Sequence, residues 1–112
     1  PLVSQAMVVG DDKPFIAALI TLDPEALEQW KQANGKPGAT LAELAGDPAI
    51  LAEMQKAVDE ANRMVSKAEQ IKKFVVLDTD LTEETGHVTP SLKLKRDIVA
   101  RDFAKQIESL YS

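Results

Sequence analysis

The segment Phe15-Ile16-Ala17-Ala18-Leu19-Ile20 is apolar at every position, and it decides the fold class of this chain. A strand with one solvated face alternates apolar and polar side chains, whereas a strand covered on both faces is apolar throughout. The run from Phe15 to Leu22 therefore predicts a strand with helices on both sides. Another apolar run, Val3 to Val9, precedes it, and Gly10-Asp11-Asp12-Lys13-Pro14 separates the two. This order predicts a β-hairpin with a long turn.

Three helix starts follow the hairpin. Asp23-Pro24 and Asp47-Pro48 each place an N-cap Asp before a Pro, whose missing N–H costs nothing at the first helical position. Thr40-Leu41-Ala42-Glu43 has the spacing of a capping box. The first two helices are expected to end at Asn34-Gly35 and at Gly46.

The helix that begins at Pro48 is expected to be the longest element. Its apolar residues recur in steps of three and four, a stripe that predicts one continuous buried face. The stripe consists of Leu51, Met54, Val58, Ala61, Val65 and Ala68. A coiled-coil partner is the alternative, but the stripe is short and contains Ala, so packing on the domain's own sheet is favoured.

The rest of the chain predicts a third strand, a loop and a last helix. Phe74 to Leu77 reads as the strand, and Thr79 to Thr89 is polar and predicts a loop or a poor strand pair. The last helix is expected from Arg96 or Asp97 to Leu110. The prediction is an α+β domain with a small three-stranded sheet, made of the N-terminal hairpin plus one strand and flanked by helices on both faces.

Size and charge limit the possible functions. With 112 residues and 45% hydrophobic content, the chain fits one compact domain. No apolar run approaches the roughly 20 residues that a transmembrane helix needs. The formal net charge of −5 repels nucleic acid and anionic lipid, so anion binding must be confined to a local basic patch. The absence of cysteine excludes disulfides and thiolate metal sites and is compatible with a cytoplasmic location.

Several candidate sites have a simpler structural explanation. The glycines do not form a phosphate-binding loop, so the domain alone is not expected to bind a nucleotide. The lone His87 lies in the polar loop without the partners of a catalytic triad and is predicted to be solvated. The acidic residues of that loop do not match an EF-hand and are predicted to be solvated, so no metal site is expected. Trp30 is predicted to pack rather than to anchor a partner.

The basic segment Thr89-Pro90-Ser91-Leu92-Lys93-Leu94-Lys95-Arg96 crowds three cations just ahead of a predicted helix. The positive end of a helix dipole repels Lys or Arg by up to about 1 kcal/mol each, so local stability does not explain these residues. Lys93 carries an ammonium group on a flexible stem, which suits it to reach a phosphate or carboxylate on another domain. The alternative is that Lys93, Lys95 and Arg96 form an ordinary solvated basic patch, with or without pairing to nearby acids.

Both ends of the chain resemble one enzyme family. Leu81 to Arg96, together with Ile107-Glu108-Ser109-Leu110-Tyr111, resembles the end of long-chain fatty acid–CoA ligases of the adenylate-forming, AMP-binding superfamily. Pro1 to Asp11, followed by Lys13-Pro14-Phe15, resembles the opening of their small C-terminal domain just past its hinge. The resemblance implies that residues 1–112 are the single C-terminal lid domain of a larger enzyme, without its hinge or large N-terminal domain. The start at Pro1 in place of Met agrees with a piece of a longer protein.

The resemblance also implies an activity. Such ligases use ATP, Mg²⁺ and coenzyme A to activate a fatty acid as acyl-AMP and to transfer it to coenzyme A, and the isolated domain is expected to bind none of these and to be inactive. By its position in the motif, Lys93 is the adenylation lysine. Leu92 stands where the wider superfamily usually has glycine, a departure that fits the long-chain branch. Lys95 and Arg96 are candidates for phosphate contacts with ATP or coenzyme A, with helix-flanking surface charges as the alternative.

The expected partners are the large N-terminal domain of the same enzyme and its substrates, with no nucleic acid. The expected location is the cytoplasm, and peripheral membrane association of the full-length enzyme stays open. The second hypothesis, from a different functional class, is a free-standing α+β module that binds a protein or a small anion through its basic connector.

Overall fold

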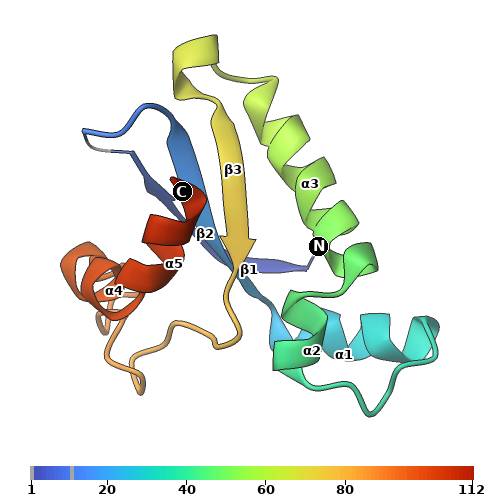
Figure 1. The fold of residues 1–112 in the computed structure, drawn as a ribbon. Helices are drawn as coiled ribbons and strands as arrows, with labels where there is room; N and C mark the ends of the chain where they lie inside the picture. Colours follow the sequence, from blue (N-terminus) through green and yellow to red (C-terminus); the bar gives the residue numbers. More distant parts are fainter. Residues whose placement is uncertain (1, 11) are drawn as a thin grey trace.

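The structure is a computed structural model that describes residues 2–10 and 12–112. Pro1 and Asp11, which belong to the expected domain start and hairpin turn, lie outside the described residues. The predicted fold class is confirmed: a three-stranded sheet lies between helices on its two sides (Figure 1).

The sheet has the order β1-β2-β3, so β2 is its central strand. β2 pairs antiparallel with β1, as the predicted hairpin requires, and parallel with β3. A parallel pair needs a long crossover, and the helices between β2 and β3 supply it. The strands are β1 (Val3–Val9), β2 (Ile16–Leu22) and β3 (Ile71–Val76).

The crossover helices begin at the predicted caps. Asp23 accepts the backbone N–H groups of Glu25 and Ala26, and Thr40 forms a reciprocal capping box with Glu43. These caps satisfy N–H groups that a helix start otherwise leaves without a partner. The helices are α1 (Pro24–Ala33), α2 (Leu41–Ala45) and α3 (Pro48–Asn62), and the 3-10 helix η1 (Lys67–Glu69) leads into β3.

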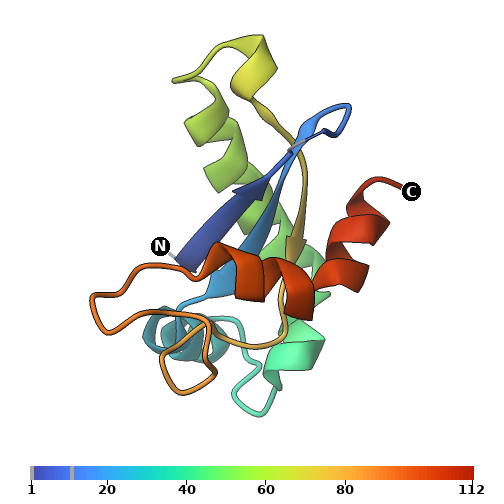
Figure 2. The same cartoon turned by 90° about the vertical axis from the view of Figure 1, so that its left-hand side faces the viewer.

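Two apolar cores lie on opposite faces of β2, as its apolar run predicts. Ala18, Ile20 and Leu22 pack with α1, α2 and α3 on one face, where Trp30 is a partly buried packing residue. Ala17 and Leu19 face the second core, beneath the last two helices of the chain. Figure 2 views the molecule from the side of these last helices, with α3 behind the sheet. Because successive strand residues point to opposite faces, one apolar run serves both cores.

The predicted stripe along α3 is wrong in its details. The buried residues are Ile50, Met54 and Val58, spaced by four, while Leu51 is 37% exposed. The helix ends at Asn62, so the predicted Val65 and Ala68 lie beyond it and are exposed. The Asn62 side chain explains this end, because it bonds the backbone N–H and C=O of Ile71 at 2.8 and 3.0 Å. These bonds hold the start of β3 against the end of α3.

The last helix is also different from the prediction, because it is broken into α4 (Arg96–Asp102) and α5 (Ala104–Leu110). The break is at Phe103, which has φ −113° and ψ 28°. Phe103 is buried in the second core, and α5 changes direction after it (Figure 1). At the end of α5, the Tyr111 hydroxyl donates to the Phe15 carbonyl at 2.8 Å. The bend therefore lets α5 follow the sheet toward the β1–β2 turn.

None of the helices in residues 2–10 and 12–112 has the length and apolar character needed to cross a membrane.

Candidate functional site

The segment of residues 78–95, here called the connector, joins β3 to α4. It has little regular structure, which confirms the predicted polar loop, but two buried apolar side chains anchor it: Leu81 is 1% exposed and Val88 is 3% exposed. Both belong to the second core. The Gln5 side chain on β1 adds a polar anchor, donating to the Leu81 carbonyl at 3.0 Å. The base of the connector is therefore attached to the sheet at several points.

The end of the connector forms a small hairpin, residues 87–95, here called the lysine hairpin. Val88 and Leu94 form an antiparallel bridge, and the Lys95 N–H donates to the His87 carbonyl at 2.8 Å. Nearer the tip, the Thr89 N–H donates to the Lys93 carbonyl at 2.8 Å, and the Lys93 N–H donates to Thr89 Oγ1 at 3.0 Å. The backbone on both sides of Lys93 is thus fixed by hydrogen bonds.

Leu92 occupies the left-handed position of this hairpin, with φ 63°. The Thr89–Lys93 pair leaves three residues, 90–92, in the loop, and within it the Leu92 N–H closes a turn onto the Thr89 carbonyl at 2.8 Å. Three-residue hairpin loops typically end in a left-handed residue. Glycine adopts this conformation without strain, whereas other L-residues lose about 1–2 kcal/mol. The position of Leu92 therefore explains why the wider superfamily can carry glycine in this place.

A backbone role for residue 92 is testable because the Leu92 side chain is 80% exposed and little burial is lost on substitution. Leu92→Ile is expected to lower the free energy of unfolding by about 1 kcal/mol, since a branched Cβ tolerates φ 63° poorly. Leu92→Gly is expected to leave stability unchanged or raise it slightly. Urea unfolding measures both variants, and equal stability of the two would contradict the assigned strain.

Lys93 lies on the loop side of the bridge and is exposed. Its ammonium group forms no ion pair with the residues that the structure describes. Among the described residues, Lys93 is therefore an unpaired surface cation, which is consistent both with a lysine that reaches another domain and with the alternative of a solvated basic patch. A solvated ammonium on a fixed backbone can meet an oxyanion on another body without first breaking an internal contact.

Lys95 and Arg96 lie at the start of α4, where the dipole disfavours cations. Lys95 is the N-cap residue and makes no side-chain cap hydrogen bond, and Arg96 is the first helical residue. Arg96 Nη2 donates to the Val8 carbonyl on β1 at 2.6 Å. The guanidinium also lines a shallow recess of about 240 Å³ with Lys13 and Tyr111. The structure thus directs Arg96 toward β1, whereas Lys95 is exposed on the hairpin side.

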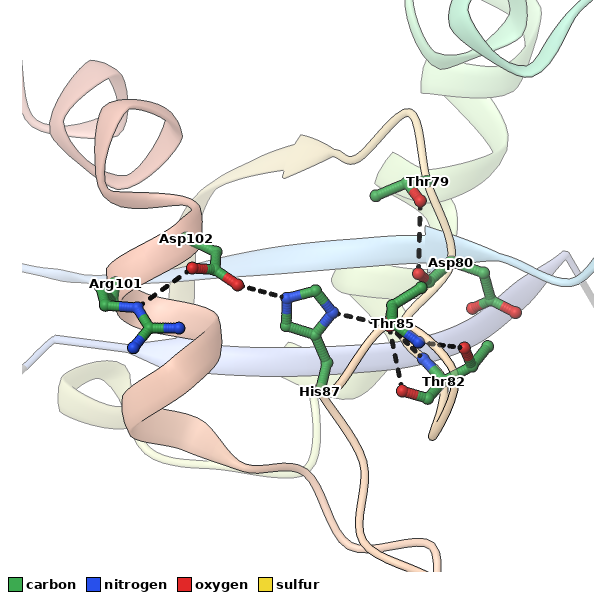
Figure 3. Close-up of polar contacts among 7 residues, drawn as sticks. All are labelled: Thr79, Asp80, Thr82, Thr85, His87, Arg101 and Asp102. Atoms are coloured by element: carbon green, nitrogen blue, oxygen red, sulfur yellow. Dashed lines mark hydrogen bonds and ion pairs between the residues drawn. The ribbon is translucent and has the colours of Figure 1, made fainter.

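The prediction that His87 is a solvated loop residue is wrong. His87 is only 7% exposed, and both ring nitrogens have partners (Figure 3). Nε2 lies 2.8 Å from the Asp102 carboxylate at the end of α4, and Nδ1 lies 2.7 Å from Thr85 Oγ1. The Phe103 ring lies against the imidazole, with 5.5 Å between centroids. No local pattern signals this cluster, because Asp102 is distant in sequence and meets His87 only when α4 packs on the connector.

The Asp102 carboxylate has two hydrogen-bond donors. Besides His87, Arg101 Nε donates to its other oxygen at 3.1 Å. The hydrogen bond from His87, and then that from Arg101, hold the pKa of the Asp102 carboxyl below its usual value. Asp102 is therefore a carboxylate at neutral pH and accepts a hydrogen bond from Nε2, which carries a proton.

The acidic residues of the connector do not converge. Asp78, Asp80, Glu83 and Glu84 form no group of three or more metal-binding side chains, and neither do His87 and the other Asp and Glu side chains within residues 2–10 and 12–112.

The sequence matches, over residues 1–112, the family described as the C-terminal domain of AMP-binding enzymes. It is 57% identical over its whole length to a long-chain-fatty-acid–CoA ligase of Mycobacterium tuberculosis, FadD15, and covers 19% of that protein. It is 36% identical, again over its whole length, to the long-chain-fatty-acid–CoA ligase ACSBG2 of Gallus gallus, and covers 17% of it. The chain thus spans about a fifth of the length of these relatives.

Solved structures show the same fold within larger chains. The adenylation domain of a carboxylic acid reductase from Segniliparus rugosus, in complex with AMP and a co-purified carboxylic acid, matches 99% of this chain with a TM-score of 0.64 and 26% identity. The corresponding domain of a carboxylate reductase from Mycobacterium chelonae matches with a TM-score of 0.65 and 25% identity. This chain covers 16% of each of these structures.

Proposed function

Because this chain belongs to the family of AMP-binding enzyme C-terminal domains, we propose that it is the small moving domain of a long-chain fatty acid–CoA ligase. Lys93 is the residue that it contributes to acyl-adenylate formation. The observation that carries this proposal is an exposed ammonium group, free of the described acids, on a backbone fixed by the lysine hairpin. The likeness to two long-chain-fatty-acid–CoA ligases over the whole chain supports the choice of substrate class.

The proposed reaction has two steps. In the first, a fatty acid carboxylate attacks the α-phosphorus of ATP, pyrophosphate leaves, and acyl-AMP forms. In the second, the thiol of coenzyme A attacks the acyl carbonyl, AMP leaves, and a thioester forms. The first step brings two anions together, so their repulsion must be offset for the attack to occur. A lysine ammonium between the carboxylate and the α-phosphate offsets it and stabilises the charge of the transition state.

The site for these anions is on the large N-terminal domain of the proposed enzyme. Lys93 reaches that site when the small domain closes on it, and a rotation of the small domain then withdraws Lys93 before the second step. Lys95, the exposed last residue of the lysine hairpin, is the better placed of the two candidates for a phosphate contact with ATP or coenzyme A. Arg96 is also exposed, but its Nη2 already donates to the Val8 carbonyl, which directs the side chain toward β1.

The Mg²⁺ that accompanies ATP is expected to be held outside this domain. In proteins Mg²⁺ is usually held by one or two carboxylates together with the phosphates of the nucleotide, and we place those phosphates on the large domain.

The free-standing binding module is the less favoured function. Its basic connector is present, but the match over residues 1–112 is to a family of enzyme domains, and the relatives are about five times longer than this chain. The two functions differ in one measurable activity, the fatty-acid-dependent exchange of pyrophosphate with ATP. Comparing this exchange in the full-length protein with and without Lys93 tests the proposal.

The isolated domain of 112 residues is expected to give no fatty-acid-dependent exchange of labelled pyrophosphate into ATP. It offers the lysine, but it has no glycine-rich loop to hold the phosphates of ATP. The full-length enzyme, measured in the same assay, is the positive control. Exchange by the isolated domain above the background without fatty acid would show that this chain carries its own active site.

A further inference from the structure

His87 lies at the base of the lysine hairpin and takes part in it through its backbone. Its carbonyl accepts the Lys95 N–H at 2.8 Å, and its own N–H donates to the Thr82 carbonyl at 3.0 Å. Residue 87 therefore joins two structures: the strand pair that carries Lys93, and the turn of residues 82–85 that precedes it. Any shift of His87 must move the base of the hairpin as well.

The side chain of His87 adds a third attachment, to α4. Nε2 donates to the Asp102 carboxylate at 2.8 Å (Figure 3). The imidazole is tilted against the Phe103 ring, with 5.5 Å between the two centroids. On the other side of the ring, Nδ1 bonds Thr85 Oγ1, which itself accepts the Thr82 N–H at 3.0 Å. The imidazole is thus a bridge between the end of α4 and the turn of residues 82–85. Among the described buried side chains, only those of His87 and Thr21 are polar.

Two kinds of evidence separate this bridge from an ordinary core contact. A buried histidine needs only hydrogen-bond partners to be tolerated, and nearby backbone groups could supply them. Here one partner is a carboxylate from a different element, and a hydrogen bond to a charged acceptor is about twice as strong as a neutral one. Asp102 in turn sits at the helix break, next to Phe103. The bridge therefore links the hairpin to the point at which α4 ends.

We propose that His87 is a positioning residue for the adenylation step, which holds the lysine hairpin on α4 through Asp102 so that Lys93 is presented in one place. This inference rests on the function proposed for Lys93. The Lys93 ammonium forms no ion pair with the described residues, so its location depends on the backbone beneath it. A displacement of about 1 Å can slow a reaction on the order of 100-fold when two reactants must be held in line.

The test uses His87→Leu and Asp102→Ala in the full-length enzyme, with each half-reaction measured separately. His87→Leu keeps an apolar side chain in the pocket but removes both ring hydrogen bonds. Asp102, with 38% of its side chain exposed, can be shortened without opening the core. Each variant is expected to lower kcat for fatty-acid-dependent pyrophosphate exchange by about 10-fold or more. Thioester formation from supplied acyl adenylate is expected to stay within about twofold of the wild type, because Lys93 is withdrawn in that step.

The double variant and a conservative variant distinguish positioning from loss of stability. If His87 acts through Asp102, the double variant is expected to be no slower than the slower single variant. The reason is that the effects of two substitutions on the rate do not add when the two residues work as one unit. His87→Gln keeps a donor for Asp102 and is expected to recover most of the adenylation rate. Asn62→Ala is the matched control: it removes two hydrogen bonds, of 2.8 and 3.0 Å, that join the end of α3 to the start of β3, away from the connector.

Equal slowing of both half-reactions by Asp102→Ala, or an adenylation rate within about twofold of the wild type, would overturn the positioning role. Should His87→Leu fail to fold, Asp102→Ala and His87→Gln still decide the question. The experiment distinguishes a failure of the role inferred for His87 from a failure of the role proposed for Lys93. If Lys93→Ala stops adenylation and Asp102→Ala does not, only the inference on His87 fails. If Lys93→Ala leaves adenylation intact, the function proposed for Lys93 and its hairpin is wrong.

Discussion

Replacing Lys93 by alanine in the full-length enzyme is expected to slow acyl-adenylate formation by about two to three orders of magnitude, the effect of removing one preorganised charge donor from a transition state. Thioester formation from supplied acyl adenylate is expected to be nearly unchanged. The difference arises because only the first step joins a carboxylate to a phosphate, and Lys93 has no described acid partner whose loss would disturb the fold. Fatty-acid-dependent pyrophosphate exchange and thioester release measure the two steps.

Two further variants make the Lys93 result specific. Lys105→Ala removes an exposed lysine from α5, away from the connector, and controls for the loss of a surface charge. Lys93→Arg keeps the charge but replaces a compact ammonium by a planar guanidinium, and we expect it to recover only part of the rate. A role in adenylation is contradicted if Lys93→Ala slows both steps equally, or if Lys105→Ala has the same effect.

Truncation of either Leu19 or Ile20 to alanine is expected to lower the free energy of unfolding by about 2–5 kcal/mol, the usual cost of emptying a packed site. These two neighbours on β2 point to opposite cores and are 1% and 3% exposed. A loss of this size is a large part of the total stability of a small domain. Urea unfolding of the domain, followed by far-ultraviolet circular dichroism, measures both variants.

The comparison of the two core variants tests whether both faces of β2 are covered. Val8→Ala on the edge strand β1, where Val8 is 41% exposed, is the control and is expected to change stability by about 0.5 kcal/mol or less. If only one of Leu19→Ala and Ile20→Ala is costly, one face of the sheet is open to solvent and the two-core arrangement is wrong.

Local signals predicted the fold well where neighbouring residues supply the interaction. Asp23 and Thr40 cap helices with N–H groups two or three residues away, so the pattern contains both partners. The apolar run of β2 likewise predicts cover on both faces whichever helices provide it. The end of α3 was missed because Asn62 bonds Ile71, a residue beyond the helix that the periodicity does not include.

In the candidate site, too, the residue in a contiguous motif was predicted and the contact between distant residues was not. Lys93 was identified from a contiguous motif, and its exposed place on the hairpin agrees with the role that the resemblance implies. His87 was taken for a solvated residue because its neighbours in sequence are polar. Its burial comes from Phe103 and Asp102, which reach it only when the final helix breaks and packs on the connector.

The sequence by itself determined the α+β class, the caps of the helices and the membership of the family, and it supplied the lysine that we propose for adenylation. Each of these depends on residues close together in the chain or on a contiguous pattern. Only the tertiary structure decided the parallel pairing of β3, the break at Phe103 and the bridge from His87 to Asp102. These features depend on contacts between distant segments, and their free energy comes from burial and hydrogen bonds that no local pattern contains.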